Sequence, residues 1–470
     1  MRLQHQGDVR TRRCVVVGLT IGFGATVLIQ AYFIMYALEG TFSPKPQAGD
    51  VLATDAPSRS VPQRRLSFDV SVWTEPQTST CGRLFANGFS DAVAECSPAL
   101  RCSRNPTSLA TLCIADDLVI DRSFVSVSAG GEPIEEVAGR DEAEEFPVYR
   151  KGALALSDAG SCSAERFDGN TFPHHLALML SSLTNGASDD VLDGITLLVT
   201  RYEYANLYHT MTDWYNTFQA WMMAIGDAKQ DEPLRIVFVD GHSSGALDKV
   251  WGALFGVEPV YISSLSQRVR FGHAVFVPVG YTSALSLGTM QVGSQCSRQP
   301  ALVHFANYFM EHVGGPPAAV VPKRPVILFV VRRDYLAHPR IGARKAERKI
   351  RNEDELVGAA QQAFPDVDVE KVAFEEMDVS EQVVAVHRAT VVVGVHGAGL
   401  THILFARGGA ALIELMPPEY AGRQHFQFIS RFIGCRYVAV PVQPSDRDGY
   451  HQVPIRPVIS EIAQSLNRVV

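Results

Sequence analysis

Apolar residues come in short runs along the second half of the chain, and one run shows the pattern most clearly. Val391–Val395 is rich in β-branched residues, which is typical of a strand that is buried on both faces. The small residues of His396-Gly397-Ala398-Gly399 follow it, then a short apolar helix pattern, and then a second buried strand predicted at Ala411–Leu415. The sequence therefore predicts a strand–glycine loop–helix–strand unit.

The glycine loop of this unit has two interpretations. In open α/β sheets, ligands bind beside the loops at the carboxyl ends of the strands. The start of the following helix offers N–H groups without intrahelical partners and the positive end of the helix dipole, so an anion is the expected ligand. Alternatively, the glycines only allow close packing of the backbone in an ordinary turn.

Similar patterns form two series, separated by the proline-rich segment Gly314–Pro325, which we interpret as a linker. In the second series, Asp378 and Glu381 have the spacing of a capping box at a helix start. Because strands that alternate with helices favour parallel sheets, we expect an α/β fold of two parallel-sheet domains that face each other across a cleft, at residues 79–315 and 322–470. The first series contains strands at Ile195–Thr200, Arg235–Val239 and Ala274–Val279 and a helix at Tyr204–Met223; the second contains strands at Val326–Val331 and Val367–Ala373 and a helix at Ser380–Ala389.

The N-terminal residues predict a membrane anchor. Cys14–Leu38 is an uncharged run of about 25 residues, which is long enough to span a bilayer. Arginines precede this run and little positive charge follows it, so the N-terminus is expected on the cytosolic side. A cleaved signal peptide is the alternative, but its apolar region would be shorter. We expect a cytoplasmic tail at residues 1–13, a transmembrane signal-anchor at 14–38 and a stem at 39–78 that holds the folded region in the lumen of the secretory pathway.

The overall composition is that of a globular protein. The 470 residues are 46% hydrophobic and carry a net charge of −8, which argues against a general nucleic-acid binder. Within this acidic chain, the segment Glu132–Glu145 is the most acidic and is predicted to be a solvated loop.

Cysteine usage agrees with a lumenal location, where disulfides persist. The spacing of Cys81, Cys96, Cys102 and Cys113 fits no zinc pattern, so we expect two local disulfides among them, with this cysteine-rich segment at the start of the first domain. Cys162, Cys296 and Cys435 leave one thiol over, and we expect it to be Cys435.

A first candidate for chemistry follows the predicted strand at Ile195–Thr200. His209 and Asp213 are four residues apart, so on a helix they share a face and could cooperate. A histidine oriented by a carboxylate is suited to general-base work on a sugar hydroxyl. The alternative is that His209 is a satisfied, partly buried helix residue and Asp213 its surface partner.

A basic cluster follows the predicted strand at Val326–Val331. Arginine side chains match phosphate oxygens bidentately, so a diphosphate is the expected partner. A solvated helix face is the alternative, most of all for Arg344, Lys345 and Lys349. The cluster comprises Arg332, Arg333, Asp334, Tyr335, His338, Arg340, Arg344, Lys345, Arg348, Lys349 and Arg351.

The sequence gives little support for a metal-dependent enzyme. Manganese-dependent nucleotide-sugar enzymes commonly place an Asp-X-Asp at a strand end, and this chain offers only Asp240-Gly-His242 there. Cationic side chains and a helix N-terminus can neutralise a diphosphate without a metal. We therefore expect no metal ligands and no cofactor. Hydrolase and nucleoside-triphosphatase motifs are also missing from the sequence.

Several blocks of the sequence together resemble glycosyltransferase family 61, and within it the plant-type branch that adds β-1,2-xylose to the N-glycan core. The resemblance covers roughly residues 80 to 465, apart from a divergent stretch at Ser157–Asp193. Single blocks such as HGAGLTH mark only the family, whereas the combination with YEYANLYHT and DYLAHPR marks the branch. The blocks are Arg201–Tyr215, Phe238–His242, Arg332–Arg340, Arg351–Leu356 and Gly394–His402, with Phe85–Phe89 and Glu144–Gly152 nearer the N-terminus.

The resemblance implies a single-pass type II Golgi membrane enzyme whose two Rossmann-like domains adopt the GT-B arrangement. Its reaction would transfer xylose from UDP-xylose, with inversion, to O-2 of the β-linked core mannose of N-glycans on secretory glycoproteins. His209 would be the base, with Asp213 orienting it or acting instead, and Glu414 would bind the ribose hydroxyls. Further implied residues are Arg333, Arg348, His396, Gly397, Ala398, Gly399 and Thr401 for the UDP-sugar, and Glu203, Asn206, Asp240 and His242 on the acceptor side.

Two alternatives remain at this point. A transferase of the same family could use a different donor or acceptor, such as an O-linked or cell-wall glycan, because donor choice rests on pocket shape. A Golgi glycan-binding protein without catalysis is the alternative from another functional class.

Overall fold

The computed structural model describes residues 71–157, 159, 162–167, 171–183, 190–225, 232–315, 322–335 and 346–469. The predicted cytoplasmic tail, signal-anchor and most of the stem lie outside these residues, as do His338, Arg340, Arg344 and Lys345. Within the described ranges, no helix is long and apolar enough to cross a membrane. The last residues of the predicted stem belong to the fold, because Trp73 is completely buried against Tyr215 and Phe218.

The first half of the described chain forms a nine-stranded sheet that mixes parallel and antiparallel pairs. The strands β11, β8, β9 and β10 run parallel, whereas β1, β2 and β3 form an antiparallel meander beside β11. The prediction of a purely parallel sheet is wrong here, because the cysteine-rich segment folds through short turns, which allow only antiparallel pairing. The strands are β1 (Asp91–Ser97), β2 (Leu100–Arg104), β3 (Thr111–Asp121), β6 (Leu154–Leu156), β7 (Leu180–Ser182), β8 (Asp190–Val199), β9 (Leu234–Phe238), β10 (Val260–Tyr261) and β11 (Arg268–Phe276), with β4 (Val125–Ser126) and β5 (Val148–Tyr149) paired separately.

The second half forms a sheet in which every pair is parallel, in the order β14-β12-β15-β16-β17. The strands predicted at Val326–Val331 and Val391–Val395 are confirmed with the same bounds. The chain passes from β12 to β14 on one side and then returns to β15 on the other, so the strand order reverses between β12 and β15. In doubly wound sheets, this reversal opens the crevice where ligands bind. The strands are β12 (Val326–Val331), β14 (Asp368–Ala373), β15 (Val391–Val395), β16 (Ala411–Met416) and β17 (Arg436–Pro441), with β13 (Lys349–Ile350) and β18 (Tyr450–His451) as a separate pair.

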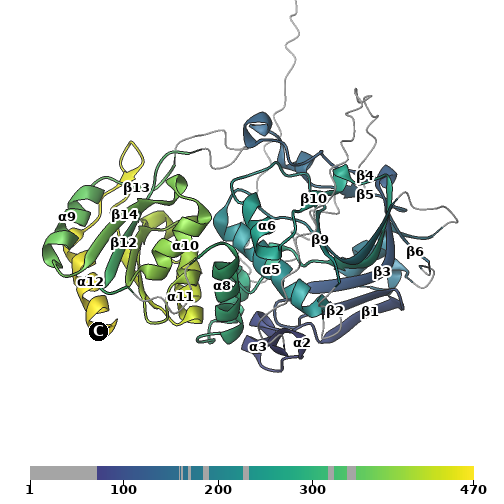
Figure 1. Ribbon diagram of the computed structural model, residues 1–470, viewed down its shortest axis with the longest axis horizontal. Helices are drawn as coiled ribbons and strands as arrows, with labels where there is room; N and C mark the ends of the chain where they lie inside the picture. The colour runs from purple at the N-terminus through teal and green to yellow at the C-terminus, as the bar shows by residue number, and fades with distance from the viewer. Residues whose placement is uncertain are drawn as a thin grey trace, which may run out of the picture.

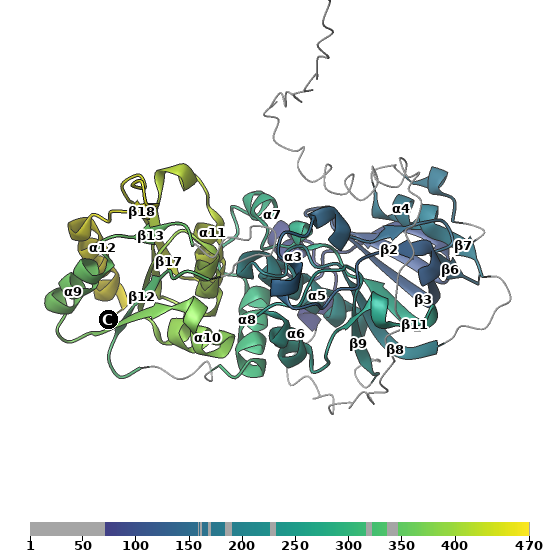
Figure 2. The same cartoon turned by 90° about the horizontal axis from the view of Figure 1, so that it is seen from above.

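Helices cover both faces of the second sheet (Figures 1 and 2). Successive side chains of a strand point to opposite faces. Ile327 and Phe329 therefore pack under α9 and α12, whereas Leu328 packs with α10, α11 and the 3₁₀ helix η8 (Ala398–Phe405). The capping box predicted from Asp378 and Glu381 is present at the start of α10. The helices are α2 (Ser71–Thr74), α3 (Thr80–Phe85), α4 (Phe172–Met179), α5 (Leu207–Ile225), α6 (Asp248–Phe255), α7 (Leu287–Val292), α8 (Pro300–His312), α9 (Glu353–Ala363), α10 (Val379–Arg388), α11 (His425–Ile433) and α12 (Ile455–Val469).

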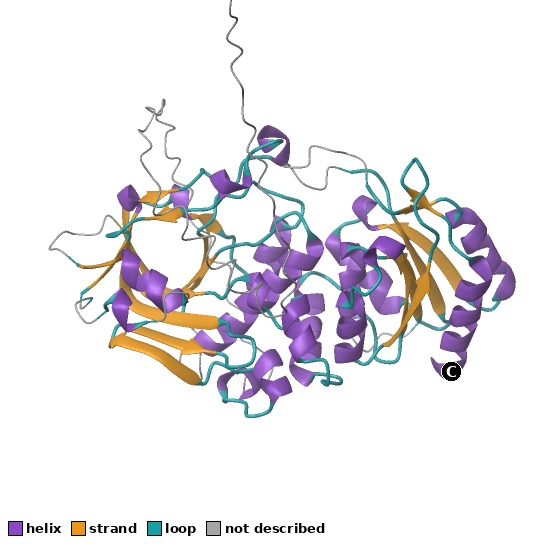
Figure 3. Cartoon of the chain, turned by 180° about the vertical axis from the view of Figure 1, so that it is seen from behind, coloured by secondary structure: helices purple, strands orange, loops and turns teal. Residues whose placement is uncertain are grey.

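The two halves share one hydrophobic core between the sheets, where many of the helices gather (Figure 3). The helix η8 packs against α10 and α11 of its own half and against α5 and α8 of the other half. The rings of Phe405 and Phe309 stack with centroids 4.7 Å apart, and Phe85 meets Phe432 at 4.8 Å. The helix that begins at the glycine loop therefore lies at the junction of the two halves.

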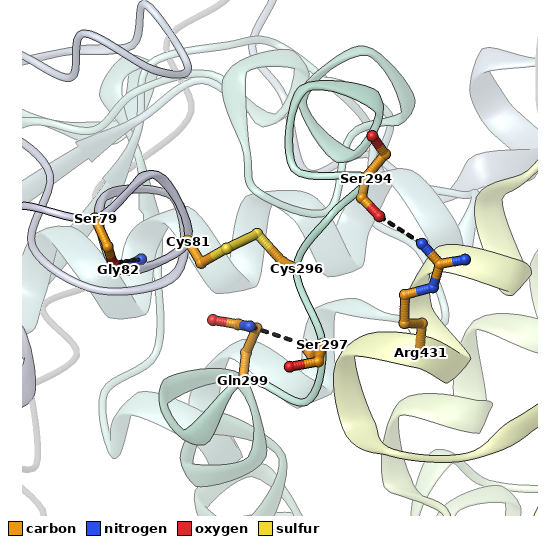
Figure 4. Close-up of a disulfide and its surroundings, with 8 residues drawn as sticks. All are labelled: Ser79, Cys81, Gly82, Ser294, Cys296, Ser297, Gln299 and Arg431. Atoms are coloured by element: carbon orange, nitrogen blue, oxygen red, sulfur yellow. Dashed lines mark hydrogen bonds between the residues drawn. A yellow bond between two sulfur atoms is a disulfide. The ribbon is translucent and has the colours of Figure 1, made fainter.

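A disulfide and polar contacts lie beside this junction (Figure 4). Cys81 of α3 is bonded to Cys296 in the loop before α8. In the same loop, the carbonyl oxygen of Ser294 accepts a hydrogen bond from the Arg431 guanidinium of α11. The loop before α8 is thus bonded to α3 through the disulfide, and it also contacts α11 of the second half.

The cysteine predictions are confirmed in part. Cys102 and Cys113 form a local disulfide, but Cys81 reaches Cys296, so the prediction of two local disulfides is wrong for Cys81. Cys162 is also disulfide-bonded. Cys435 is the free, buried cysteine of the described residues, as predicted.

A buried ionic network lies beneath the loop that follows β8. Arg201 and Asp240 are completely buried and form an ion pair of 2.7 Å. The Asp240 carboxylate also accepts hydrogen bonds from the backbone N–H groups of Arg201 and His242. His242 Nδ1 lies 2.6 Å from Glu145 Oε2, and both side chains are completely buried. Asp240 and His242, which the resemblance places on the acceptor side, therefore fix the chain and have no exposed surface for a ligand.

The acidic segment Glu132–Glu145 is solvated over most of its length, as predicted, since Glu135, Glu136, Asp141 and Glu144 are exposed, but its two ends are held by the fold. Glu145 at its end is buried against His242, and Glu132 at its start pairs with Arg140 at 2.9 Å. The carbonyl of Glu132 accepts the N–H of Ser244. The prediction therefore fails at Glu145, which contacts His242 of a distant loop, and at Glu132, which pairs with Arg140 of its own segment.

Asp240→Asn tests the structural role of this carboxylate. Removing one partner of a buried ion pair costs about 3–5 kcal/mol, so we expect the free energy of unfolding in urea to fall by that amount. Burial alone would raise the pKa of Asp240, but the charge and hydrogen bonds of Arg201 overcome burial and lower the pKa. The pair therefore stabilises the fold fully at neutral pH and less as the pH falls below about 4, toward the folded-state pKa. Unchanged stability would contradict the structural role, and Asp117→Asn, at an exposed position, is the control.

Candidate functional site

Polar and aromatic side chains collect where the order of parallel strands reverses, in both sheets. In the first sheet, β8 lies between β9 and β11, and the loops after β8 and β11 lead to α5 and to the 3₁₀ turn η6 (Gly280–Thr282). In the second sheet, Arg332 follows β12 and His396 follows β15. Both positions are carboxyl ends of strands at a switch point, where α/β proteins bind ligands.

His209 lies in the first turn of α5, beside the crevice of the first sheet. Its ring meets Tyr202 edge-on at 4.7 Å and lies 6.5 Å from Tyr281 of η6. Within the described chain, neither ring nitrogen is hydrogen-bonded and neither is a buried unpaired atom, so the imidazole remains accessible. Burial lowers the pKa of His209, although the negative charge of Glu203 acts in the opposite direction. An accessible imidazole that is neutral at neutral pH is suited to accept a proton.

Asp213 does not make the contact with His209 that their spacing predicted. Its Oδ2 accepts the backbone N–H of Tyr202 at 2.9 Å, and no hydrogen bond joins it to His209 in the part of the chain described. Asp213 is 2% exposed, and burial raises its pKa well above the ordinary value, with the charge of Asp240 adding to the effect. One turn farther into the helix than His209, it is covered by the loop. Asp213 therefore positions Tyr202, whose ring packs on His209, and its carboxyl group has almost no exposed surface.

Glu203 and Asn206, which the resemblance places on the acceptor side, have different positions. The side-chain oxygen of Asn206 accepts the N–H of Tyr208 at 3.0 Å, so Asn206 caps the start of α5. Glu203 is half-buried, and its charge acts on the pKa of both His209 and Asp213. Glu203 therefore belongs to the surroundings of His209, whereas Asn206 serves the helix.

Arg332 and Arg348 gather beside the glycine loop. A Cβ atom on Gly397 would lie 2.3 Å from Arg332 Nη1, so the guanidinium rests directly on this glycine. Burial lowers the pKa of Arg348, and the positive charge of Arg332 lowers it further. Within the described residues, the Nε atoms of both arginines are buried without a hydrogen-bond partner, and neither side chain has a carboxylate partner. Such a pair of cations is suited to bind an anion.

Arg333, which the resemblance assigns to the diphosphate, points elsewhere. Its guanidinium forms an ion pair of 2.7 Å with Glu353 of α9, and this hydrogen bond raises the pKa of Arg333. Neighbouring residues at a strand end point to opposite faces of a sheet. Arg332 therefore reaches the face of η8, and Arg333 reaches the face that α9 covers.

Tyr420 and Arg423 complete the cationic cluster, and neither was predicted from the sequence. The guanidinium groups of Arg348 and Arg423 lie 4.7 Å and 5.0 Å from the Tyr420 ring centre. The His396 ring stacks on Tyr420 at 4.9 Å. One aromatic ring thus holds three cationic or titratable groups together. Tyr420 and Arg423 belong to no motif in the sequence. Their position shortly after the end of β16 is the signal that could have indicated a role at the site.

The glycine loop is placed as predicted, at the start of a helix, although this helix is 3₁₀. Gly397 and Ala398 lead into η8, and a Cβ on Gly399 would lie 3.2 Å from the Phe374 ring. The two glycines therefore have different roles. Gly397 leaves room for the Arg332 guanidinium, and Gly399 allows close packing against the Phe374 ring. Thr401 is completely buried, so it does not reach the position that its predicted contact with a ligand requires.

His396 and Glu414 form a buried pair. His396 Nδ1 is hydrogen-bonded to Glu414 Oε1, and the Tyr437 hydroxyl donates to Glu414 Oε2 at 2.7 Å. Glu414 is completely buried and both of its oxygens are occupied. Glu414 therefore offers no exposed oxygen to the ribose hydroxyls that the resemblance implies it binds, because it lies on β16 between β15 and β17 and is covered by its neighbours.

His425 connects the two crevices. Its ring meets Tyr208 of α5 at 4.9 Å and lies 6.1 Å from the His396 ring. Burial lowers the pKa of His425 to about 4, and the charges of His396, Arg423 and His209 contribute. His425 therefore lies between α5, which carries His209, and the cationic cluster of the second half. Among the described residues, no group of three His, Cys, Asp or Glu side chains could hold a metal ion.

The chain is similar to known proteins over most of its length. The family model described as Glycosyltransferase 61 matches residues 205–413, which run from the start of α5 to β16. A β-1,2-xylosyltransferase of Oryza sativa subsp. japonica is 32% identical over 84% of this chain and 81% of its own length. A β-1,2-xylosyltransferase of Arabidopsis thaliana is 29% identical over 78% and 83%. An EGF domain-specific O-linked N-acetylglucosamine transferase of Gallus gallus is 27% identical over 56% and 47%.

The similarity extends over most of this chain and most of the rice and Arabidopsis proteins. The matched region contains His209, Arg332, Arg348 and the glycine loop. The chain therefore belongs to glycosyltransferase family 61 and is a glycosyltransferase.

Proposed function

We propose that this glycosyltransferase transfers xylose from UDP-xylose, with inversion, to O-2 of the β-linked core mannose of N-glycans. The observation that carries the reaction is one site with two opposed parts. One part is Arg332 and Arg348, which have no acid partner among the described residues, and the other is the accessible, neutral His209. The choice of xylose and of the N-glycan core is supported by the rice and Arabidopsis relatives and by the sequence blocks of the same branch.

Each part of the site has one task in this reaction. Arg332 and Arg348, with the start of η8 behind Gly397, bind the diphosphate and stabilise the charge that develops on it. The acceptor hydroxyl attacks C1 of xylose from the face opposite the diphosphate, while His209 takes the hydroxyl proton. The C1–O bond to the phosphate breaks and its electron pair leaves with UDP. Attack from the opposite face inverts the configuration at C1.

We also propose that the reaction requires no metal ion, because the arginines supply the positive charge that a leaving diphosphate needs. The two halves would correspond to the acceptor-side and donor domains of a GT-B enzyme. The proposed location is the Golgi membrane, with Cys14–Leu38 as the anchor and the described residues in the lumen. Disulfides such as Cys81–Cys296 support an oxidising compartment.

A transfer assay tests the proposed reaction. The full-length protein, purified in detergent, is incubated with labelled UDP-xylose and an N-glycan that ends in N-acetylglucosamine. We expect incorporation of xylose at the core mannose, at the same rate with EDTA. Incorporation from another UDP-sugar instead would indicate a different transferase of the family. Binding of UDP without transfer from any donor would indicate a glycan-binding protein, and a loss of activity in EDTA would contradict metal independence.

Alanine substitutions separate the arginines that bind the diphosphate from the one that does not. Arg332→Ala and Arg348→Ala each remove a charged hydrogen bond, so we expect UDP affinity to fall by about 1.5–3 kcal/mol, or roughly 10- to 150-fold. Arg333→Ala is the matched control, because Arg333 is already paired with Glu353. Titration calorimetry measures the three affinities. A larger loss for Arg333→Ala than for the other two would reverse the assignment.

His209→Ala should abolish transfer and leave UDP affinity unchanged, because His209 lies across the site from the arginines. The pH dependence gives a second readout. Burial lowers the pKa of His209, so its neutral, proton-accepting form persists as the pH falls below 6.5. We expect the transfer rate to be constant above this pH and to fall on the acid side through the lowered pKa. If His209→Ala retained near-normal turnover, the base would be another group, and Glu203 would be the next candidate.

A further inference from the structure

A file of four rings runs from the proposed base to the cationic cluster. The ring centroids of His209 and Tyr208 lie 5.1 Å apart, and those of Tyr208 and His425 lie 4.9 Å apart. The His425 ring in turn lies 6.1 Å from the His396 ring. The first two residues belong to α5 of the first half, whereas His425 begins α11 and His396 follows β15 in the second half. The file therefore crosses the junction between Tyr208 and His425.

Of the two middle rings of this file, His425 is the one that presents surface to a ligand. Tyr208 is 9% exposed, whereas His425 is only half-buried. The Nδ1 atom of His425 is buried without a partner among the described residues. Its Nε2 atom makes no hydrogen bond there either, but it is not one of the buried unpaired atoms, so this nitrogen is accessible. A ligand beside His425 therefore meets the Nε2 edge of the ring.

The proposed reaction requires the transferred sugar to lie beside this ring. C1 of the sugar carries the diphosphate that Arg332 and Arg348 bind. The acceptor hydroxyl, whose proton goes to His209, approaches C1 from the opposite face. The sugar ring therefore lies between the arginines and the base, and this is where His425 stands, between α5 and the cationic cluster.

His425 is suited to contact a neutral sugar rather than the diphosphate. Burial, with smaller contributions from the charges of His396, Arg423 and His209, lowers the pKa of His425 to about 4, so the ring carries no charge at neutral pH. A neutral imidazole has one N–H and one lone pair, and a sugar hydroxyl both donates and accepts. The accessible Nε2 therefore has a partner in a hydroxyl group, whichever of the two nitrogens carries the proton.

The His425 ring is also held in place by its neighbours. The Tyr208 ring meets it edge-on, and Tyr208 is itself fixed, because its hydroxyl donates a hydrogen bond of 2.7 Å to the carbonyl of Leu285. The buried ring of Phe426 lies 6.1 Å from His425 on the other side of the same helix turn. Side chains in packed surroundings have little room to change rotamer. His425 therefore forms a fixed wall for whatever lies beside it.

We propose that His425 borders the transferred sugar and selects a pentose, because Nε2 hydrogen-bonds a sugar hydroxyl and the fixed ring occupies the space that the hydroxymethyl group of a hexose needs. This inference rests on the proposed function and assigns the choice of donor sugar to one residue. UDP-glucose is the matched competitor, since it differs from UDP-xylose only by a hydroxymethyl group at C5. A wall that clashes with this group rejects UDP-glucose without changing the contacts to the shared diphosphate.

The test is the affinity for UDP, UDP-xylose and UDP-glucose, measured by calorimetry with the full-length protein in detergent and without acceptor. UDP reports on the fold and on the diphosphate contacts, and the two nucleotide sugars report on the sugar. We expect the wild-type protein to bind UDP-xylose at least about 10-fold more tightly than UDP-glucose, the order of discrimination that one carbon group gives.

Two substitutions separate the hydrogen bond from the bulk of the ring. His425→Phe keeps a ring but removes Nε2, so UDP-xylose affinity should fall about 2- to 10-fold, the value of one neutral hydrogen bond, while UDP-glucose stays excluded. His425→Ala removes both, so UDP-xylose affinity should fall similarly while UDP-glucose affinity rises toward it and transfer of glucose becomes measurable. UDP affinity should be unchanged in both variants. His312→Ala on α8 is the matched control, because its ring is also stacked but lies outside the site, and it should keep the wild-type affinities.

The outcomes distinguish this inference from the proposed function. Wild-type affinities in both His425 variants would overturn the inference, even if the wild-type protein transferred xylose to the N-glycan. Equal wild-type affinities for UDP-xylose and UDP-glucose would overturn it as well. If His425→Ala lost UDP affinity through misfolding, His425→Phe would decide alone, and unchanged UDP-xylose affinity in that variant would rule out the hydrogen bond. Conversely, the expected affinities without transfer to the N-glycan would support the sugar contact and contradict the proposed reaction.

Discussion

The packing of η8 against helices of both halves is the constraint on which the site depends. This helix begins at the glycine loop, and its Phe405 stacks on Phe309 of α8 in the first half. The same helix also packs on α5, which carries His209. One short helix therefore packs against both the helix that carries His209 and the half that carries the cationic cluster. The Cys81–Cys296 disulfide and the Arg431 contact beside it stabilise the same junction.

Charge is distributed very differently in the two crevices. Beneath the first, Asp240 is completely buried against Arg201 and Glu145 against His242, so each carboxyl group has a partner within the protein. Beside the second, the arginines at the glycine loop remain without acid partners in the described chain. A protein retains uncompensated cations at a stability cost, which an anionic ligand removes when it binds. The contrast distinguishes a structural network from a binding site more clearly than residue type does.

The sequence predicts those features that depend on local pattern. The buried strands β12 and β15, the capping box at Asp378 and the glycine loop follow from apolar runs and short-range spacing, and all are found where they were expected. The antiparallel meander in the first sheet was not predicted, because strand pairing is decided by partners far away in the chain. The same holds for Cys81, whose partner Cys296 lies 215 residues away.

The candidate site shows the same limit at the level of single residues. The basic run after β12 leads to the prediction of an anion site, but only the sheet decides that Arg332 faces the glycine loop while Arg333 pairs with Glu353. Glu414 stands at a strand end, as a ribose ligand would, yet its neighbours His396 and Tyr437 enclose it. The spacing of His209 and Asp213 places them on one helix face, but helix spacing does not predict that the loop at Tyr202 covers Asp213.

The central claim is that the cationic cluster and His209 face each other across one donor site. A crystal structure of the protein with bound UDP tests it most directly. The account predicts diphosphate oxygens within about 2.7–3.2 Å of the guanidinium nitrogens of Arg332 and Arg348, with the terminal phosphate directed toward the side of His209. A UDP molecule bound on the α9 face beside Arg333, or with its diphosphate directed away from His209, would contradict the account.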